Sequence, residues 1–206
     1  MSLARLLQLA SPTLPVGAYS YSQGMESAIE AGLVKDANSA ERWIGDVLEL
    51  SVARMEAQIL RRQMQAPSQE LNDFFLATRE TAELRAETLQ MGHSLAKLLA
   101  EVGIEVPIGQ PAFPTAYACA VRQWSIEPRD ALVAYLWSWI ENQVMAAIKA
   151  VPLGQTAGQR ILLSLGNRLD GLAGLEIPEE QWCNFAPGLA FLSARHETQY
   201  SRLFRS

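Results

Sequence analysis

Hydrophobic residues along most of the chain are spaced three and four positions apart, which is the period of an amphipathic helix. Residues 38–65 show this period most clearly, and Asn38 to Glu41 have the spacing of a capping box at its start. Residues 131–150 are hydrophobic on nearly all sides, which predicts a buried central helix. Further helices are predicted over residues 3–9, 23–31, 71–78, 82–100, 115–124, 155–172 and 189–200.

The same pattern gives no support for a β-sheet. No five-residue stretch alternates apolar and polar side chains with β-branched bias and turn signals on both sides. The connections between the predicted helices are short, and no repeat stands out. The sequence therefore predicts an all-α fold, a single compact bundle of about eight to ten helices over residues 1–206.

A loop rich in proline, glycine and hydroxyl side chains follows the first predicted helix. Two prolines prevent that helix from continuing. Tyr19 and Tyr21 each combine an apolar ring with a polar hydroxyl, which suits packing on one side and hydrogen bonding on the other. We therefore expect residues 1–22 to form a helix and an ordered loop. Glu26 follows in the first turn of the next helix, where a carboxylate complements the helix dipole.

Composition and charge exclude several classes of protein. The chain of 206 residues is 49% hydrophobic and 19% charged, which suits one domain with a substantial core. A net charge of −5 opposes binding to nucleic acid. The longest nearly apolar run, residues 131–140, is about half the roughly 20 residues that a bilayer span requires, so no membrane helix is expected. The N-terminus has no secretory signal pattern, and the cytoplasm is the expected location.

The usual catalytic motifs are missing from the sequence. Residues 154–160 lack the spacing and the lysine of a phosphate-binding loop, and no Gly-x-Ser-x-Gly pentapeptide occurs. The two histidines and two cysteines are scattered, so neither a metal site nor a disulfide is expected. His196, beside a glutamate, is the one candidate metal ligand, but a lone histidine rarely suffices. The row Glu80, Glu83 and Glu87 is interpreted as a solvated helix face.

Residues 197–206 form a distinctive end segment. Leu203 and Phe204 lie between Arg202 and Arg205, which combines apolar and guanidinium groups. Segments of this kind often become ordered on a partner, with the aromatic ring as an anchor and arginine as a planar donor. We therefore expect this tail to bind a partner, with Phe204 filling an apolar pocket.

Four blocks of the chain closely resemble the urease accessory protein UreF family, and together they span essentially its full length. The first begins Leu6-Leu7-Gln8-Leu9 and includes the proline-tyrosine loop, and the last begins His196-Glu197-Thr198. Ala18 stands where the family usually has a second glycine. The blocks cover residues 6–26, 79–92, 151–155 and 196–206.

The resemblance implies an all-helical, dimeric, cytoplasmic maturation chaperone for nickel urease and not an enzyme. Such a protein bridges the scaffold UreD (also called UreH) and the GTPase UreG, and the complex carries nickel to apo-urease. No cofactor is expected on this chain, because nickel and GTP would be handled through the partners. The alanine-rich residues 115–124 are a candidate dimer face. The residues expected to bind partners are Tyr19, Tyr21, Glu26, His196, Glu197, Tyr200, Arg202, Leu203, Phe204 and Arg205.

Three further hypotheses concern the same residues. Arg202 is expected to fold back near Tyr19 or Tyr21, so that docking of the tail shapes the surface seen by the GTPase. A rival interpretation is a small helical enzyme that uses Tyr21, Glu26 and His196 as acid and base groups. Another is a regulator with a DNA-reading helix, which the acidic balance disfavours.

Overall fold

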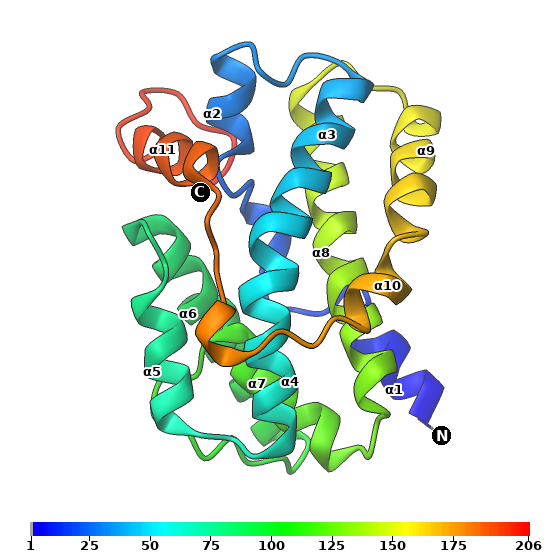
Figure 1. Ribbon diagram of the computed structural model, residues 1–206, viewed down its shortest axis with the longest axis vertical. Helices are drawn as coiled ribbons and strands as arrows, with labels where there is room; N and C mark the ends of the chain where they lie inside the picture. Colours follow the sequence, from blue (N-terminus) through cyan, green and yellow to red (C-terminus); the bar gives the residue numbers. More distant parts are fainter. Residues whose placement is uncertain (1) are drawn as a thin grey trace.

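Two long helices, packed side by side, form the axis of the molecule in the computed structural model, which describes residues 2–206 (Figure 1). One runs without interruption through α3, η2 and α4, and the other is α8. The helices are α1 (Ser2–Leu9), α2 (Met25–Glu30), α3 (Ala37–Val47), η2 (Leu48–Glu56), α4 (Ala57–Gln65), α5 (Gln69–Ala77), α6 (Ala82–Glu101), α7 (Phe113–Gln123), α8 (Pro128–Ala150), α9 (Gln155–Gly166), α10 (Leu169–Ala173) and α11 (Pro187–His196), with short 3-10 turns η1 (Ala18–Ser20) and η3 (Glu179–Gln181).

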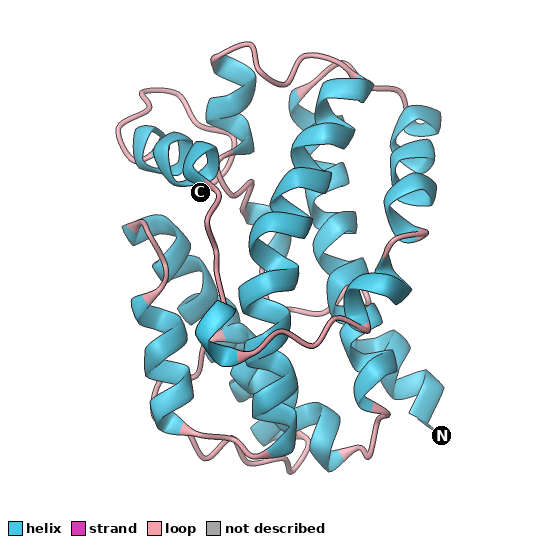
Figure 2. Ribbon diagram, in the orientation of Figure 1, coloured by secondary structure: helices cyan, strands magenta, loops and turns pink. Residues whose placement is uncertain are grey.

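The all-α prediction is confirmed. The structure is 68% helical, and the residues it describes contain no strand (Figure 2). Because α3, η2 and α4 are continuous, the described part of the chain forms ten helices in a single compact domain, within the predicted range. None of these helices combines the length and the apolar composition needed to cross a membrane.

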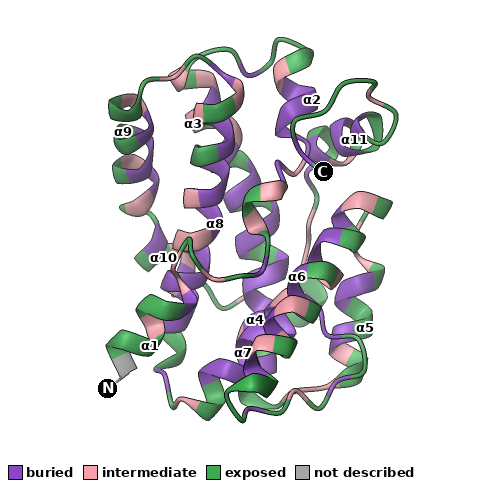
Figure 3. Ribbon diagram, turned by 180° about the vertical axis from the view of Figure 1, so that it is seen from behind, coloured by how far each residue is buried: buried purple, intermediate pink, exposed green. Residues whose placement is uncertain are grey.

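The predicted central helix is α8, which packs against α1, α2, α3, α4, α9 and α10. Its side chains Leu132, Leu136, Ile140 and Val144 are fully buried. Figure 3 shows that much of this helix is buried. The helix begins with Pro128 at its first position, where the missing N–H costs no hydrogen bond.

Several helix boundaries differ from the prediction, and three of these differences bear on the architecture. The capping box lies at Asp36 and Ser39, two positions earlier than expected, because the Asp36 carboxylate accepts from the Ser39 N–H at 2.8 Å and the Ser39 hydroxyl accepts from the Asp36 N–H at 3.1 Å. The stretch 155–172 divides at Asn167 into α9 and α10. The last helix, α11, ends at His196, and the chain then continues as a non-helical tail.

The helix α7 is not available as a dimer face. Its residues from Pro114 to Val121 are all buried in this chain, between α4 and α6. The alanines allow close packing inside the domain, so the candidate dimer face at 115–124 is wrong.

Two glycines mark places where helices and loops approach closely. A side chain at Gly92 of α6 would overlap the backbone carbonyl oxygen of Pro111, in the loop before α7. Gly24, with φ +76°, lies where α2 meets α11, and a Cβ there would be 3.2 Å from the Ser193 backbone nitrogen. In the proline-tyrosine loop, Gly17 takes a positive φ of 80°, whereas Ala18 begins the turn η1.

Substitution of Gly92 by alanine tests the tight contact of α6 with the loop before α7. The added Cβ would collide with backbone that cannot rotate away, so we expect the Gly92→Ala variant to lose about 1–3 kcal/mol of unfolding free energy in urea. Gly171→Ala in α10 is the matched control, because no atom lies within 4 Å of the place its added Cβ would take and alanine favours helix. Equal stability of the two variants would contradict this packing argument.

Candidate interaction site

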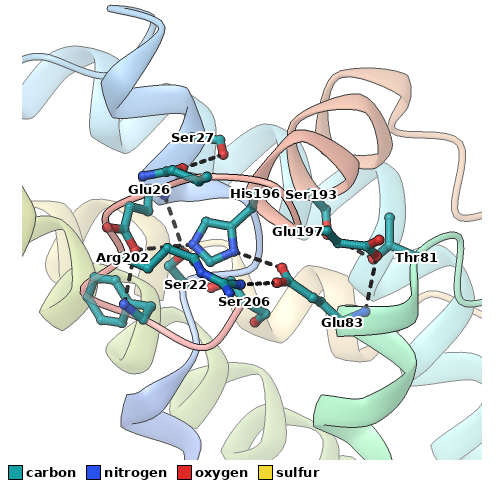
Figure 4. Close-up of polar contacts among 12 residues, drawn as sticks. Ser22, Glu26, Ser27, Thr81, Glu83, Ser193, His196, Glu197, Arg202 and Ser206 are labelled. Carbon is teal, nitrogen blue, oxygen red and sulfur yellow. Dashed lines mark hydrogen bonds and ion pairs between the residues drawn. The ribbon is translucent and has the colours of Figure 1, made fainter.

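The C-terminal tail, residues 197–206, lies against the start of α2 and the first turns of α6 (Figure 4). Glu26, in the first turn of α2, accepts the backbone N–H of Leu203 at 2.7 Å and that of Phe204 at 3.0 Å. Glu26 is buried, so these bonds to a charged acceptor are stronger than the same bonds in water. The tail is itself neither helix nor strand, and these bonds satisfy two of its backbone donors.

The end of the tail binds the loop before α2 through backbone atoms. The Arg205 N–H donates to the Ser20 carbonyl oxygen at 2.7 Å. The Ser206 carbonyl oxygen accepts from both the N–H and the hydroxyl of Ser22, each at 2.6 Å. The proline-tyrosine loop and the tail, at opposite ends of the sequence, therefore form one structural unit.

His196 is fully buried between two carboxylates (Figure 4). Its Nδ1 lies 2.7 Å from Glu83 and its Nε2 lies 3.2 Å from Glu26. Ionised carboxylates only accept hydrogen bonds, so both ring nitrogens donate when both glutamates are ionised. Arg202 donates to the other oxygen of Glu83 at 2.8 Å, and the two cations then balance the two carboxylates.

Glu197 joins the tail to the N-terminus of α6. Its carboxylate accepts from the backbone N–H of Ala82 at 2.9 Å, where a negative charge complements the helix dipole. Thr81 caps the same helix by accepting from the Leu84 N–H at 3.2 Å, and its hydroxyl lies 2.8 Å from that of Ser193 in α11. The start of α6 is thus held by α11 and the tail together.

Glu87 is buried one turn further along α6, so the interpretation of this glutamate row as a solvated face is wrong at this position. Its carboxyl accepts from the Gln23 amide at 2.7 Å and from the Ser206 hydroxyl at 3.0 Å. Burial raises the pKa of Glu87 to about 7. The periodicity of the helix alone would not reveal that Glu87 is buried, because the tail that contacts it comes from a distant part of the sequence.

The side chain of Phe204 is buried within its own chain. Its ring is 6% exposed and packs in the core of the chain, with the Lys149 ammonium of α8 4.7 Å from the ring centroid. In this structure Phe204 therefore packs in the core of its own chain, and its expected contact with a partner stays a prediction. Tyr200 and Leu203, in contrast, are exposed.

Arg205, and not Arg202 as expected, is the tail arginine that lies beside Tyr21. Arg202 pairs with Glu83, away from both tyrosines, whereas the Arg205 guanidinium lies beside Tyr21. The path of the tail explains this difference, because residue 202 contacts α6 and residue 205 contacts the proline-tyrosine loop. Burial and the charge of Glu87 raise the pKa of Tyr21, and Arg205 partly offsets this. Tyr19 remains partly exposed, with its pKa raised by burial and by Glu141.

The acid and base groups of the rival enzyme hypothesis do not share an accessible site. Glu26 and His196 are adjacent, but both are buried by contacts with the tail. A cavity of about 60 Å³ lies nearby, and its lining includes Tyr19 and Glu87 but not Tyr21, Glu26 or His196. Within residues 2–206 no group of three histidine, cysteine, aspartate or glutamate side chains is arranged to hold a metal ion, and both nitrogens of His196 already face carboxylates.

Fold and site together define an all-helical protein whose clustered carboxylates hold its own C-terminal tail in place. The family model for UreF matches residues 34–166. Relatives named "Urease accessory protein UreF" extend the match: that of Azoarcus sp. strain BH72 is 55% identical over 100% of this chain and 96% of its own length. Those of Dechloromonas aromatica (50%) and Methylobacillus flagellatus (49%) cover 100% of this chain and 98% of their own lengths. The chain belongs to the UreF family of urease accessory proteins.

Replacement of Glu26 by glutamine tests its role in holding the tail. The amide removes the charge and offers one acceptor oxygen in place of two, so we expect the Leu203 and Phe204 amides to exchange with solvent deuterium about tenfold faster or more. Hydrogen exchange measured residue by residue provides the readout.

Glu30→Gln is the matched control, because Glu30 lies in the same helix and is exposed. We expect this variant to exchange its tail amides at the wild-type rate. Equal protection of the tail in the Glu26→Gln variant would refute the assigned role of Glu26.

Proposed function

We propose that this protein is a non-catalytic scaffold in urease maturation, which bridges UreD/UreH and the GTPase UreG so that nickel reaches apo-urease. Family membership supports a role in urease maturation. The observation that carries the bridging role is the docked tail, which presents exposed apolar and cationic side chains beside the proline-tyrosine loop.

The tail supplies a surface suited to a protein partner. Tyr200 and Leu203 are exposed although both are large and apolar, and Arg205 is exposed next to them. Tyrosine, leucine and arginine together provide apolar contact area and a planar hydrogen-bond donor, a combination typical of protein interfaces. We assign this surface to UreD/UreH.

The proline-tyrosine loop is the proposed contact for UreG. Partly exposed Tyr19 lies in the turn η1, whose last residue, Ser20, binds the tail through Arg205. A partner that moves the tail would therefore alter the loop directly, which provides a physical route for influencing the GTPase step.

Nickel and GTP are assigned to the partner proteins. The chain contains no Walker-type phosphate-binding sequence, and His196 is enclosed by its two glutamates. We also propose that the protein works in the cytoplasm as a homodimer, in keeping with the urease accessory family. The dimer face lies outside α7, which is buried.

The bridging role can be tested with exposed residues of the tail, so that the fold is preserved. We expect the double substitution Tyr200→Ser and Leu203→Ser to weaken co-purification with UreD/UreH about tenfold or more and to lower urease activation in cells. Deletion of residues 197–206 should abolish both.

Leu163→Ser on α9 is the matched control, because Leu163 is 70% exposed and far from the tail contacts. Circular dichroism of each variant checks that the helices remain. If the chain without residues 197–206 still captures UreD/UreH, the assigned surface is wrong.

The proposed homodimer predicts a specific mass in solution. At micromolar concentration, sedimentation equilibrium should give about twice the 22.7 kDa of one chain. A mass of one chain throughout that range would contradict the dimer while leaving the bridging role open to its own test.

A further inference from the structure

Glu87 is a buried carboxyl group whose direct partners are neutral. It accepts from the Gln23 amide at 2.7 Å and from the Ser206 hydroxyl at 3.0 Å. Arg79, whose charge acts on Glu87, instead pairs with Glu56 at 3.4 Å. An ionised Glu87 therefore holds a negative charge out of water without a cation in contact with it, which is unfavourable.

The charged and titratable groups around Glu87 come from every element packed against it. Glu83 of the same helix already binds His196 and Arg202, and the Arg205 guanidinium lies beside Tyr21. The surrounding groups are Tyr21 from the loop before α2, Glu56 from η2, Arg79 from the loop before α6, Tyr135 and Glu141 from α8, and Arg205 from the tail.

Protons can reach Glu87 while the tail stays docked. Glu87 lines the cavity of about 60 Å³, which is large enough for water. The same cavity is lined by Tyr19 and Glu141, which are both partly exposed. Exchange of the Glu87 proton with solvent therefore does not require the tail to open first.

We propose that Glu87 is a proton-controlled catch for the C-terminal tail, which holds Ser206 when the carboxyl is protonated and favours release of residues 203–206 when it ionises. Release exposes the carboxylate to bulk solvent, which stabilises its charge better than the small cavity can. Because Ser206 also binds Ser22, the proline-tyrosine loop loses its tail contact in the same step. The consequence for partner docking rests on the proposed function, whereas the catch itself is a property of the isolated chain.

The direction of the pH effect follows from the two states of the tail. With the tail docked, burial raises the pKa of Glu87 to about 7, although the bonds from Gln23 and Ser206 act in the opposite direction, and after release the pKa falls toward its ordinary value of 4.5. The docked state therefore binds more protons between these values. Its extra stability is fully present below pH 4.5 and is lost as the pH rises through about 7.

Hydrogen exchange of the isolated chain tests the catch. After correction for the intrinsic exchange rate, the opening constant of the Leu203, Phe204 and Arg205 amides should rise about tenfold between about pH 6 and 8. The Glu87→Gln variant should remove this rise, because glutamine keeps a neutral hydrogen-bonding group in place. Glu101→Gln, at the exposed end of the same helix, should keep the wild-type profile.

Each outcome decides for or against the catch. A flat wild-type profile would overturn the proposal, and so would a rise that persists in Glu87→Gln, which would assign the pH dependence to another group. If the Glu87→Gln variant does not fold, a carbon-13 titration of the wild-type Glu87 carboxyl replaces it. A midpoint near 7 that coincides with tail opening supports the catch, and a midpoint near the ordinary value of 4.5 refutes it.

Discussion

The buried carboxylate of Glu26 is the contact on which the docked tail depends. A segment that is neither helix nor strand has no regular backbone partners, so its backbone donors require other acceptors. Glu26 supplies two of them and also contacts His196, which ends α11. Each hydrogen bond to a charged group contributes about 1.5–3 kcal/mol, whereas a buried unpaired carboxylate would be strongly unfavourable. Tail and carboxylate therefore stabilise each other.

Two further carboxylates, both on α6, bind the tail and the histidine that precedes it. Glu83 binds His196 and Arg202, and Glu87 binds Ser206. In the opposite sense, the tail residue Glu197 supplies a carboxylate that accepts from the first backbone N–H of α6. The tail is thus bound by polar groups at both ends and in its middle, with the ring of Phe204 as its main apolar contribution.

The helices could be predicted from sequence because their period and end signals are local, as the buried α8 illustrates. The interaction site cannot be predicted in the same way, because its contacts join residues more than 100 positions apart. A glutamate row looks solvated until a distant tail covers it, which is why the burial of Glu87 was not predicted. The π-helical segment η2 was also missed, since apolar spacing of three and four does not reveal a widened turn. That segment ends at Glu56, which accepts the hydroxyl of Tyr135 in the core.

The close approach at Gly24 sets the spacing of α2 and α11. A Cβ there would lie 3.2 Å from the Ser193 backbone nitrogen and 3.3 Å from a Leu189 methyl carbon, so a larger residue would push the two helices apart. Glu26 lies on one of these helices and His196 ends the other, and their side chains are 3.2 Å apart. The missing side chain two positions before Glu26 therefore allows α2 to come close enough to α11 for this carboxylate to reach both the histidine and the tail.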